Sequence, residues 1–377
     1  MIEIKRELKE QILKKLQPNK VVVITGARRV GKTFLLKEII SGQESDYLLL
    51  NGEDMNTHLL LEKHSVENYK NILGKNKILI IDEAQKIPEI GSILKLIVDE
   101  IKGIRIVVTG SSAFDINNLT GEPLAGRKHT FILHPLSVRE HSQAEDQLSR
   151  PDRLNQKLIY GNYPELLHID DPVSRQEYLN EIISSYLLRD ILSFENVRNS
   201  AKIFNLLRLI AFQTGNLVSY NELGKQLGIS KNTVEKYLDL LTKVFILFKI
   251  EGYSRNLRKE ITKNCKWYFY DNGVRNAVIS NFNTPELRND NGQLWENFLA
   301  SERLKHQQFN RIKSNNFFWR TYDRQEIDWI EEHGGKLDGY EFKIKSRRGQ
   351  APAAWRKAYP DAGYEEITRD NYFQWLT

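Results

Sequence analysis

Residues 20–41 join two apolar runs through a short loop that is rich in glycine and in cationic residues. The loop, GARRVGKT, fits the phosphate-binding pattern G-x-x-x-x-G-K-[ST] from Gly26 to Thr33. The preceding KVVVIT is short and β-branched, which is typical of a strand buried on both faces. The following TFLLKEII has apolar residues at helical spacing. A strand, a glycine loop and a helix in this order predict an α/β fold with a parallel sheet. A chance glycine-lysine turn is the alternative.

The chemistry of such a loop favours a nucleotide with Mg²⁺. Backbone N–H groups and the start of a helix attract phosphates, and glycines allow the close approach. Lys32 would reach the β- and γ-phosphates, and the Thr33 hydroxyl would bind Mg²⁺. Arg28 and Arg29 are expected to point outward, towards a base, a ribose or a neighbouring subunit. The residues expected to contact the nucleotide here are Gly26, Ala27, Arg28, Arg29, Val30, Gly31, Lys32, Thr33 and Phe34.

Two further apolar runs end in polar residues. KILIIDEAQ, residues 77–85, ends a buried-looking strand in two carboxylates. In the phosphate-loop pattern Asp82 holds Mg²⁺ and Glu83 activates the attacking water, whereas the alternative is a solvated strand end. IRIVVTGSS, residues 104–112, would place Thr109, Ser111 and Ser112 near the γ-phosphate, because ligands bind beyond the carboxyl ends of parallel strands. A strand-to-loop turn with hydroxyl caps explains the third run equally well.

Five segments together carry a family resemblance: GARRVGKT, ILIIDEAQKIP, VVTGSSAFDI, LAGRKHTFILHPLSVRE and GNYPE. They resemble prokaryotic AAA-type ATPases of the STAND-related branch, and the resemblance covers most of the chain. It implies ATP as the nucleotide, Mg²⁺ as its cofactor, and a carboxyl-terminal region of unassigned function. In related enzymes an arginine from a neighbouring subunit or from the lid completes the site. Arg127 is the candidate for this catalytic role and Arg189 the second, although either could pair with a local carboxylate. An arginine supplied in trans would require a homo-oligomer.

The length and composition of the chain limit its possible domains, partners and compartment. A chain of 377 residues is too long for one ordinary core, and its net charge of +6 suits a polyanionic partner. Apolar runs are far shorter than the roughly 20 residues that cross a bilayer, so no membrane partner is expected. The first ten residues mix both charge signs, which does not suit a signal peptide. The single cysteine, Cys265, fits a reducing compartment, so we expect a cytoplasmic protein.

A helix-turn-helix pattern follows the first half of the chain. In VSYNELGKQLGISKNTVEKYLDLL, Ser219 and Ser230 are candidate helix caps and Gly228 is a candidate tight turn. Two strand-like runs, FILFKI and KWYFY, complete a predicted winged helix. DNA, in double-stranded or branched form, is the expected partner. Protein docking is the alternative, since winged helices also serve that role. The residues predicted to contact DNA are Lys231, Asn232, Lys236, Arg255 and Arg258, with Thr233, Lys259 and Lys263 nearby.

The last hundred residues resemble a PD-(D/E)XK nuclease core. Asp328 ends a predicted strand, and Glu341 and Lys343 lie two apart on the returning strand, on one face of it. Glu296 lies on a helix similar to the first helix of that core. Two carboxylates hold a divalent metal in such nucleases and a lysine orients the water, so Glu296, Asp328, Glu341 and Lys343 form a candidate second metal site. The proline that gives this nuclease motif its name does not precede Asp328. The alternative is a cross-strand pairing of an acid and a lysine on an ordinary hairpin.

These patterns predict four regions. They are an AAA-type core (1–150), a helical lid or linker (151–200), a winged helix (201–280) and a small α/β nuclease-like domain (281–377). The predicted function is an Mg-dependent ATPase that couples ATP binding and hydrolysis to DNA handling through its carboxyl-terminal region. Two alternatives remain: an ATP-dependent switch in signalling or defence with a protein-docking tail, and an ATP-gated, metal-dependent DNA nuclease.

Overall fold

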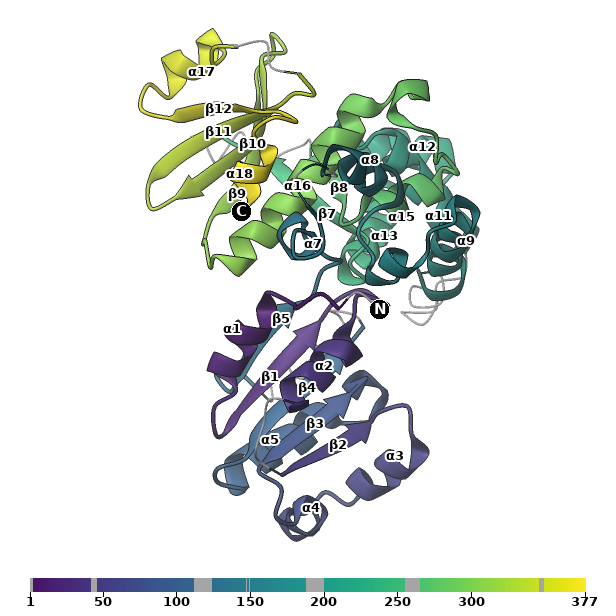
Figure 1. The fold of residues 1–377 in the computed structure, drawn as a ribbon, viewed down its shortest axis with the longest axis vertical. Coiled ribbons are helices and arrows are strands. Elements are labelled where there is room, and N and C mark those ends of the chain that lie inside the picture. The colour runs from purple at the N-terminus through teal and green to yellow at the C-terminus, as the bar shows by residue number, and fades with distance from the viewer. Residues whose placement is uncertain are drawn as a thin grey trace. The chain divides into compact units, whose positions relative to one another are not determined.

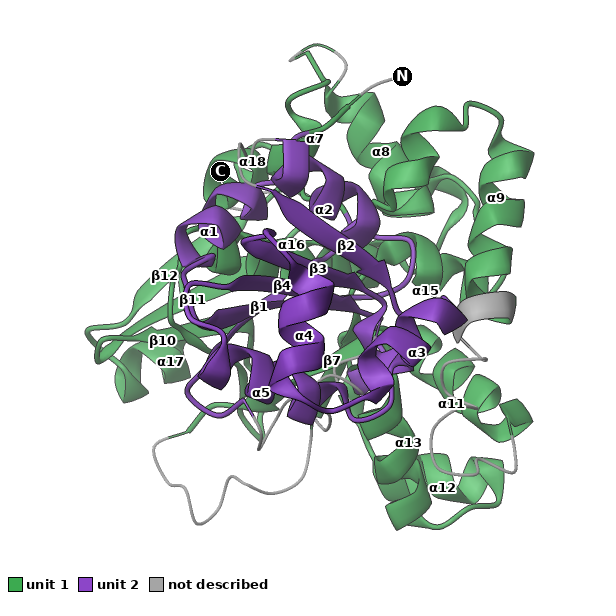
Figure 2. Cartoon of the chain, turned by 90° about the horizontal axis from the view of Figure 1, so that it is seen from below, with its two compact units in different colours: residues 1–4, 136–242, 246–377 green, residues 5–135, 243–245 purple. Residues whose placement is uncertain are grey.

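The computed structural model describes residues 3–41, 46–111, 124–146, 148, 150–187, 200–254, 265–345 and 349–377. The sites predicted at Ser112, Arg189, Arg255, Arg258, Lys259 and Lys263 lie outside these ranges. The chain divides into two compact units, which Figure 2 colours separately. Unit 2 consists of residues 5–135 and 243–245, and unit 1 of residues 1–4, 136–242 and 246–377.

Unit 2 is built on a five-stranded parallel sheet with strand order β2-β3-β4-β1-β5 (Figure 1). Its strands are β1 (Lys20–Thr25), β2 (Tyr47–Asn51), β3 (Ile78–Asp82), β4 (Arg105–Gly110) and β5 (Lys128–Ile132). Its helices are α1 (Leu8–Lys15), α2 (Lys32–Ser41), α3 (Met55–Glu62), α4 (Val66–Leu73), the 3₁₀ turn η1 (Ala84–Lys86) and α5 (Ile90–Glu100).

The order of these strands follows from their side chains. In β1 and β4 every residue after the first is buried, as expected for strands covered on both faces. β2 has three exposed residues among its five and lies at the edge of the sheet. In this order β4 lies between β1 and β3, so the carboxyl ends of all three strands meet at one edge of the sheet. The predicted α/β fold with a parallel sheet is therefore confirmed.

Unit 1 joins a group of helices to a mixed seven-stranded sheet of order β12-β11-β10-β9-β7-β8-β6. Its helical elements are α7 (Val138–His141), α8 (Arg150–Tyr160), η2 (Pro164–His168), α9 (Pro172–Glu181), the π-helical turn η3 (Ile182–Leu187), α11 (Ser200–Phe212), α12 (Tyr220–Leu227), α13 (Lys231–Lys243), α15 (Asn272–Val278), η4 (Pro285–Leu287), α16 (Asn291–Phe309), α17 (Ala353–Ala358) and α18 (Tyr372–Leu376). Its strands are β6 (Leu217–Val218), β7 (Leu247–Gly252), β8 (Cys265–Phe269), β9 (Asn315–Arg320), β10 (Glu326–His333), β11 (Lys336–Phe342) and β12 (Gly363–Ile367).

The helix pair α12–α13 has the caps and the turn that its sequence indicates. The Ser219 hydroxyl accepts a hydrogen bond from the Glu222 N–H, and the Ser230 hydroxyl accepts one from the Thr233 N–H. Gly228 lies between the helices with φ of 60°, a left-handed conformation that glycine adopts readily. The strands that follow do not form a separate small sheet, because β7 pairs with β9 as well as with β8. One sheet thus runs through the ranges predicted as winged helix and as nuclease-like domain.

Within the described ranges, no helix combines the length and the apolar character needed to cross a membrane.

Candidate functional site

The loop between β1 and α2 is packed tightly against the strand beside it. Gly26 has φ of 153°, and a Cβ atom there would lie 2.2 Å from the Leu133 carbonyl oxygen. Any other residue would push the loop off the end of β5. Gly31 and Arg29 also have positive φ, at 93° and 64°. The loop therefore curls back on itself, in the manner that directs successive backbone N–H groups to one side.

Lys32 is held inside this loop. Its side chain is 5% exposed, and its ammonium group donates hydrogen bonds to the carbonyl oxygens of Gly26 (3.0 Å) and Ala27 (2.9 Å). Both acceptors are neutral. A phosphate oxygen is a stronger partner for an ammonium group, because charge-assisted hydrogen bonds are roughly twice as strong as neutral ones. The loop thus holds a buried cation at the start of a helix, which is suited to binding an anion.

Thr33 and Asp82 meet although they are 49 residues apart. The Thr33 hydroxyl donates to Asp82 Oδ2 across 2.7 Å. The other carboxylate oxygen of Asp82 accepts a hydrogen bond from the Thr109 hydroxyl, and that same hydroxyl accepts one from the Glu83 N–H at 3.1 Å. The loop after β1 and the ends of β3 and β4 are thereby tied together. A hydroxyl and a carboxylate at this spacing are the two hard oxygen ligands that an Mg²⁺ bound to phosphates requires of the protein.

Glu83 has a strained backbone and a restrained side chain. Its φ of 50° and ψ of 42° lie in the left-handed region, where non-glycine residues are uncommon and often functional. The Gln85 amide donates to the Glu83 carboxylate at 2.5 Å and to the Ser111 hydroxyl at 3.2 Å. Gln85 therefore links the acid after β3 to the hydroxyl after β4. Ser111 is thus connected to Glu83 through the Gln85 amide. Gln85 itself was not among the site residues predicted from the sequence.

Two other residues of this site escape sequence reasoning. Arg6 is 5% exposed and donates to the carbonyl oxygens of Val30 at 2.6 Å and His134 at 2.7 Å. It joins the phosphate-loop segment to the segment after β5. Gly52 follows β2, and a Cβ atom there would lie 2.2 Å from the Glu83 carbonyl oxygen. Neither residue belongs to a motif, and an arginine so near the amino terminus is normally solvated, so only the fold reveals these contacts.

Arg127 does not lie near the phosphate loop of its own chain. Its carbonyl oxygen accepts a hydrogen bond from the Val21 N–H, at the amino end of β1, whereas the loop follows the carboxyl end. Its guanidinium group pairs with Asp99 at 2.7 Å. The structure thus shows the local carboxylate pairing that the sequence left open. A role at the site of a neighbouring subunit remains a prediction.

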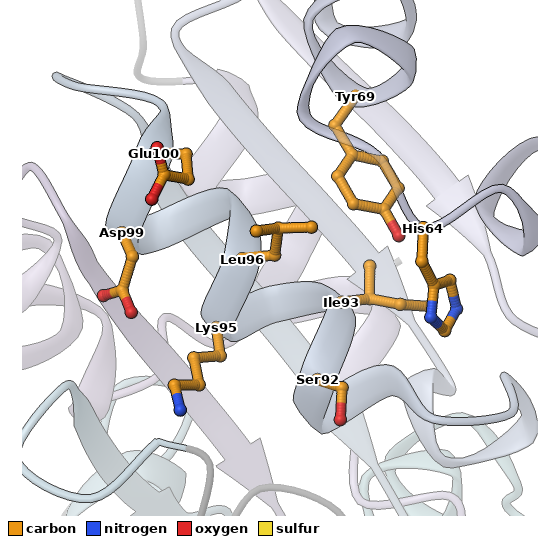
Figure 3. A pocket seen from close by; sticks show the side chains of 8 residues that line it. All are labelled: His64, Tyr69, Ser92, Ile93, Lys95, Leu96, Asp99 and Glu100. Atoms are coloured by element: carbon orange, nitrogen blue, oxygen red, sulfur yellow. The ribbon is translucent and has the colours of Figure 1, made fainter.

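A hollow of unit 2 that described residues line is a separate feature. It measures about 510 Å³ and lies along α5, with Lys95 and Asp99 on that helix and His64 and Tyr69 on the far side (Figure 3). Burial, together with the nearby Glu89, raises the pKa of Tyr69. Its lining includes none of the phosphate-loop residues. The hollow is therefore separate from the predicted nucleotide site.

Three of the residues predicted to contact DNA lie on the first half of α13, and the other two, Arg255 and Arg258, lie outside the described residues. Lys231, Asn232 and Lys236 are exposed, but Glu235 and Asp239 are exposed on the same helix. The residues Val234, Leu238 and Leu241 on the opposite face of α13 are buried in unit 1. The exposed face of α13 is therefore polar and of mixed charge.

The four residues of the second predicted site are only partly brought together. Lys266 on β8 lies among the carboxylates of Glu296 (2.9 Å), Glu326 (2.7 Å) and Asp328 (3.4 Å). Glu341 pairs at 2.6 Å with Lys343, two residues further along the same segment, which is not the cross-strand pair of the hairpin alternative. Burial, reinforced by Asp328, raises the pKa of Glu341 to about 7.

A divalent metal between Glu296 and Asp328 would lie next to the ammonium group of Lys266. Among the described residues, no three His, Cys, Asp or Glu side chains are arranged to hold one, and an ammonium group already lies between Glu296 and Asp328.

Comparison with known proteins places three family models along the chain. Residues 18–142 match an AAA domain, residues 151–285 match a domain of unknown function (DUF8612), and residues 291–371 match another (DUF4143). The matched AAA range contains the phosphate loop, Asp82 and Glu83. The chain therefore contains an AAA-type P-loop ATPase domain.

Similar proteins occur in bacteria and archaea. An uncharacterized protein of Mycobacterium tuberculosis is 26% identical over 345 residues, which cover 91% of this chain and 74% of that protein. One of Methanocaldococcus jannaschii is 24% identical over 400 residues, covering 95% and 86%. Both similarities extend well beyond the AAA range, so the carboxyl-terminal regions are shared as well.

Among solved structures, a STAND protein with a tetratricopeptide repeat sensor from Pyrococcus horikoshii aligns at 14% identity and a TM-score of 0.34, covering 81% of this chain and 46% of that one. Bacteroides Pif1 bound to ssDNA aligns at 17% identity and a TM-score of 0.28, covering 48% and 50%. This chain thus spans about half the length of either structure.

Proposed function

We propose that this protein is an Mg-dependent ATPase that couples ATP binding and hydrolysis to the handling of DNA held by its carboxyl-terminal region. The observation that carries the ATPase proposal is the hydrogen bond between Thr33 and Asp82. It joins the two protein oxygens that bind Mg²⁺ in P-loop enzymes, beside the buried ammonium group of Lys32.

In this proposal each residue of the site has a separate task. Lys32 leaves its two carbonyl partners for the phosphates and neutralises their charge. Thr33 and Asp82 would hold the Mg²⁺, which would offset the negative charge of the phosphates. Glu83 accepts the proton of the attacking water, and Gln85 orients its carboxylate.

The DNA part of the proposal rests on the capped helix pair α12–α13 and on the exposed Lys231, Asn232 and Lys236. Asn232 and the two lysines are of the types that contact base edges and phosphates. The basic net charge of the chain adds general attraction for a polyanion.

ATP hydrolysis rates of the wild type and three variants, with and without double-stranded and branched DNA, test the proposal. Lys32→Ala should abolish hydrolysis by removing phosphate binding, and Glu83→Gln should bind ATP but turn it over very slowly. Lys37→Ala, on the exposed face of the same helix, should behave as the wild type. Normal turnover by both of the first two variants would refute the site.

The double variant Lys231→Ala, Lys236→Ala tests the DNA surface. It should weaken DNA binding and reduce its salt dependence, because two phosphate contacts would be lost. The matched control, Lys336→Ala with Lys357→Ala, removes two exposed lysines elsewhere. It should leave the DNA affinity and its salt dependence unchanged.

A protein-docking switch is the second candidate, and the mixed charge of α13 favours it. Glu235 and Asp239 would repel DNA phosphates but suit a protein surface. ATP turnover that ignores every DNA form but responds to a protein partner would support this candidate over the first.

A further inference from the structure

Lys266 is almost completely enclosed, and three carboxylates surround its ammonium group. Its side chain is 1% exposed, and the group lies 2.9 Å from Glu296, 2.7 Å from Glu326 and 3.4 Å from Asp328. It donates hydrogen bonds to Glu296 and Asp328 and forms an ion pair with Glu326. The aromatic ring of Phe318 lies 5.6 Å from the same nitrogen.

These carboxylates also have other protein partners. Asp328 Oδ2 accepts the backbone N–H of Phe342 at 2.9 Å, and Glu326 Oε2 lies 3.2 Å from Arg320. The Tyr268 hydroxyl donates to the Glu296 oxygen that faces Lys266, at 2.6 Å. Donors of the chain itself thus hold all three carboxylates.

The charges of the cluster favour retention of this ammonium group. Three carboxylates lie within 3.4 Å of the ammonium nitrogen, so its positive charge is compensated although the side chain is buried. A divalent ion among the same oxygens would lie next to a buried positive charge that cannot reach water. Metal binding at this point would therefore require Lys266 to leave.

We propose that Lys266 is a built-in cation that takes the place of a divalent metal between α16, β8 and β10, so that this cluster neither binds a metal nor cleaves phosphodiesters. The lysine performs the structural part of a metal's task by joining Glu296 of the helix to Glu326 and Asp328 of the strand. If the carboxyl-terminal region holds DNA as proposed above, it holds it without cutting.

Titration calorimetry with Mn²⁺, without nucleotide, tests the proposal. The protein is the full chain with Asp82→Asn. This substitution removes a candidate Mg²⁺ ligand of the ATPase site, so that metal binding there does not enter the measurement. We expect no saturable binding with a dissociation constant tighter than about 1 mM, the weak end of the range for protein sites of divalent ions. Stoichiometric binding that Asp328→Asn then removes would overturn the proposal.

Lys266→Met in the same background is the converse test. It removes the charge and shortens the side chain by one atom, so we expect it to gain one Mn²⁺ per chain. A folded Lys266→Met variant that still binds no Mn²⁺ would show that something other than the ammonium group keeps the metal out. This result would overturn the proposal that Lys266 takes the place of a metal.

Thermal unfolding keeps the proposal testable if Lys266→Met does not fold. The Asp82→Asn chain should melt at the same temperature in Mn²⁺ and in EDTA. A stabilisation by Mn²⁺ that Asp328→Asn removes would contradict the proposal. So would Mn²⁺- or Mg²⁺-dependent DNA cleavage that is lost in Asp328→Asn but kept in Lys32→Ala. The Lys32→Ala variant separates this outcome from failure of the ATPase proposal.

Discussion

The Thr33 hydroxyl lies 2.7 Å from the Asp82 carboxylate and donates a hydrogen bond to it, although the two residues belong to different elements. Because a bound Mg²⁺ would need both oxygens, we expect Asp82→Asn and Thr33→Val to lower the rate of ATP hydrolysis on the order of 100-fold, as a metal supplies several kcal/mol of charge stabilisation.

Thr33→Ser keeps the hydroxyl and is the matched control. Its rate should stay close to that of the wild type, and the measurement is hydrolysis as a function of Mg²⁺ concentration. Thr33→Val activity that equals the Thr33→Ser activity at every concentration would show that the hydroxyl takes no part.

Gln85 positions Glu83, and its removal should affect turnover more than binding. We expect Gln85→Ala to lower kcat about tenfold with little change in KM, because one hydrogen bond to a charged group contributes about 1.5–3 kcal/mol. The measurement is steady-state kinetics. Lys86→Ala, an exposed neighbour, is the control. A rise in KM with an unchanged kcat would place Gln85 in nucleotide binding instead.

Arg6 should affect nucleotide binding although it lies outside every motif. Arg6→Ala leaves the buried carbonyl oxygens of Val30 and His134 without these donors, at a cost of about 1–3 kcal/mol each. We expect a lower melting temperature and roughly tenfold weaker ATP binding, since part of that cost falls on the loop. Arg6→Lys should recover part of the melting temperature and part of the ATP affinity, and Lys5→Ala should change neither quantity. Equal ATP affinity in all four proteins would confine Arg6 to a structural role.

Stability should depend on pH through Glu296. Burial raises its pKa from 4.5 to about 7, while Lys266 opposes the shift and Asp328 adds to it. Between these two pH values the folded protein retains a proton that the unfolded chain releases, so this contribution falls as pH rises from about 4.5 to 7.

The full contribution of Glu296 to the free energy of unfolding is on the order of 3 kcal/mol, at about 1.4 kcal/mol per pKa unit. Urea unfolding of the wild type and of Glu296→Gln across this range measures it, because the difference between the two cancels other titrating groups such as Glu341. The stability of the wild type relative to Glu296→Gln should decline as pH rises. A constant difference would mean that Glu296 keeps an ordinary pKa in the folded protein.

The sequence by itself determined the features that depend on neighbouring residues. A β-branched run, a glycine loop and an amphipathic run were enough to predict the parallel α/β fold, because strand burial and helix periodicity are local patterns. Ser219, Gly228 and Ser230 could be recognised for the same reason, since caps and turns involve residues only a few positions apart. Asp82 was recognisable because an apolar strand that ends in carboxylates is costly without a cationic partner.

Only the tertiary structure decided which distant groups meet. Arg6 lies 128 residues from His134, and Lys266 lies 62 residues from Asp328, so no periodicity or motif connects them. The pattern of Asp328, Glu341 and Lys343 pointed to a metal, but a lysine from another strand lies beside Asp328. The physical reason is that burial makes each charge find a partner, and the folding of the sheet determines which partner is within reach.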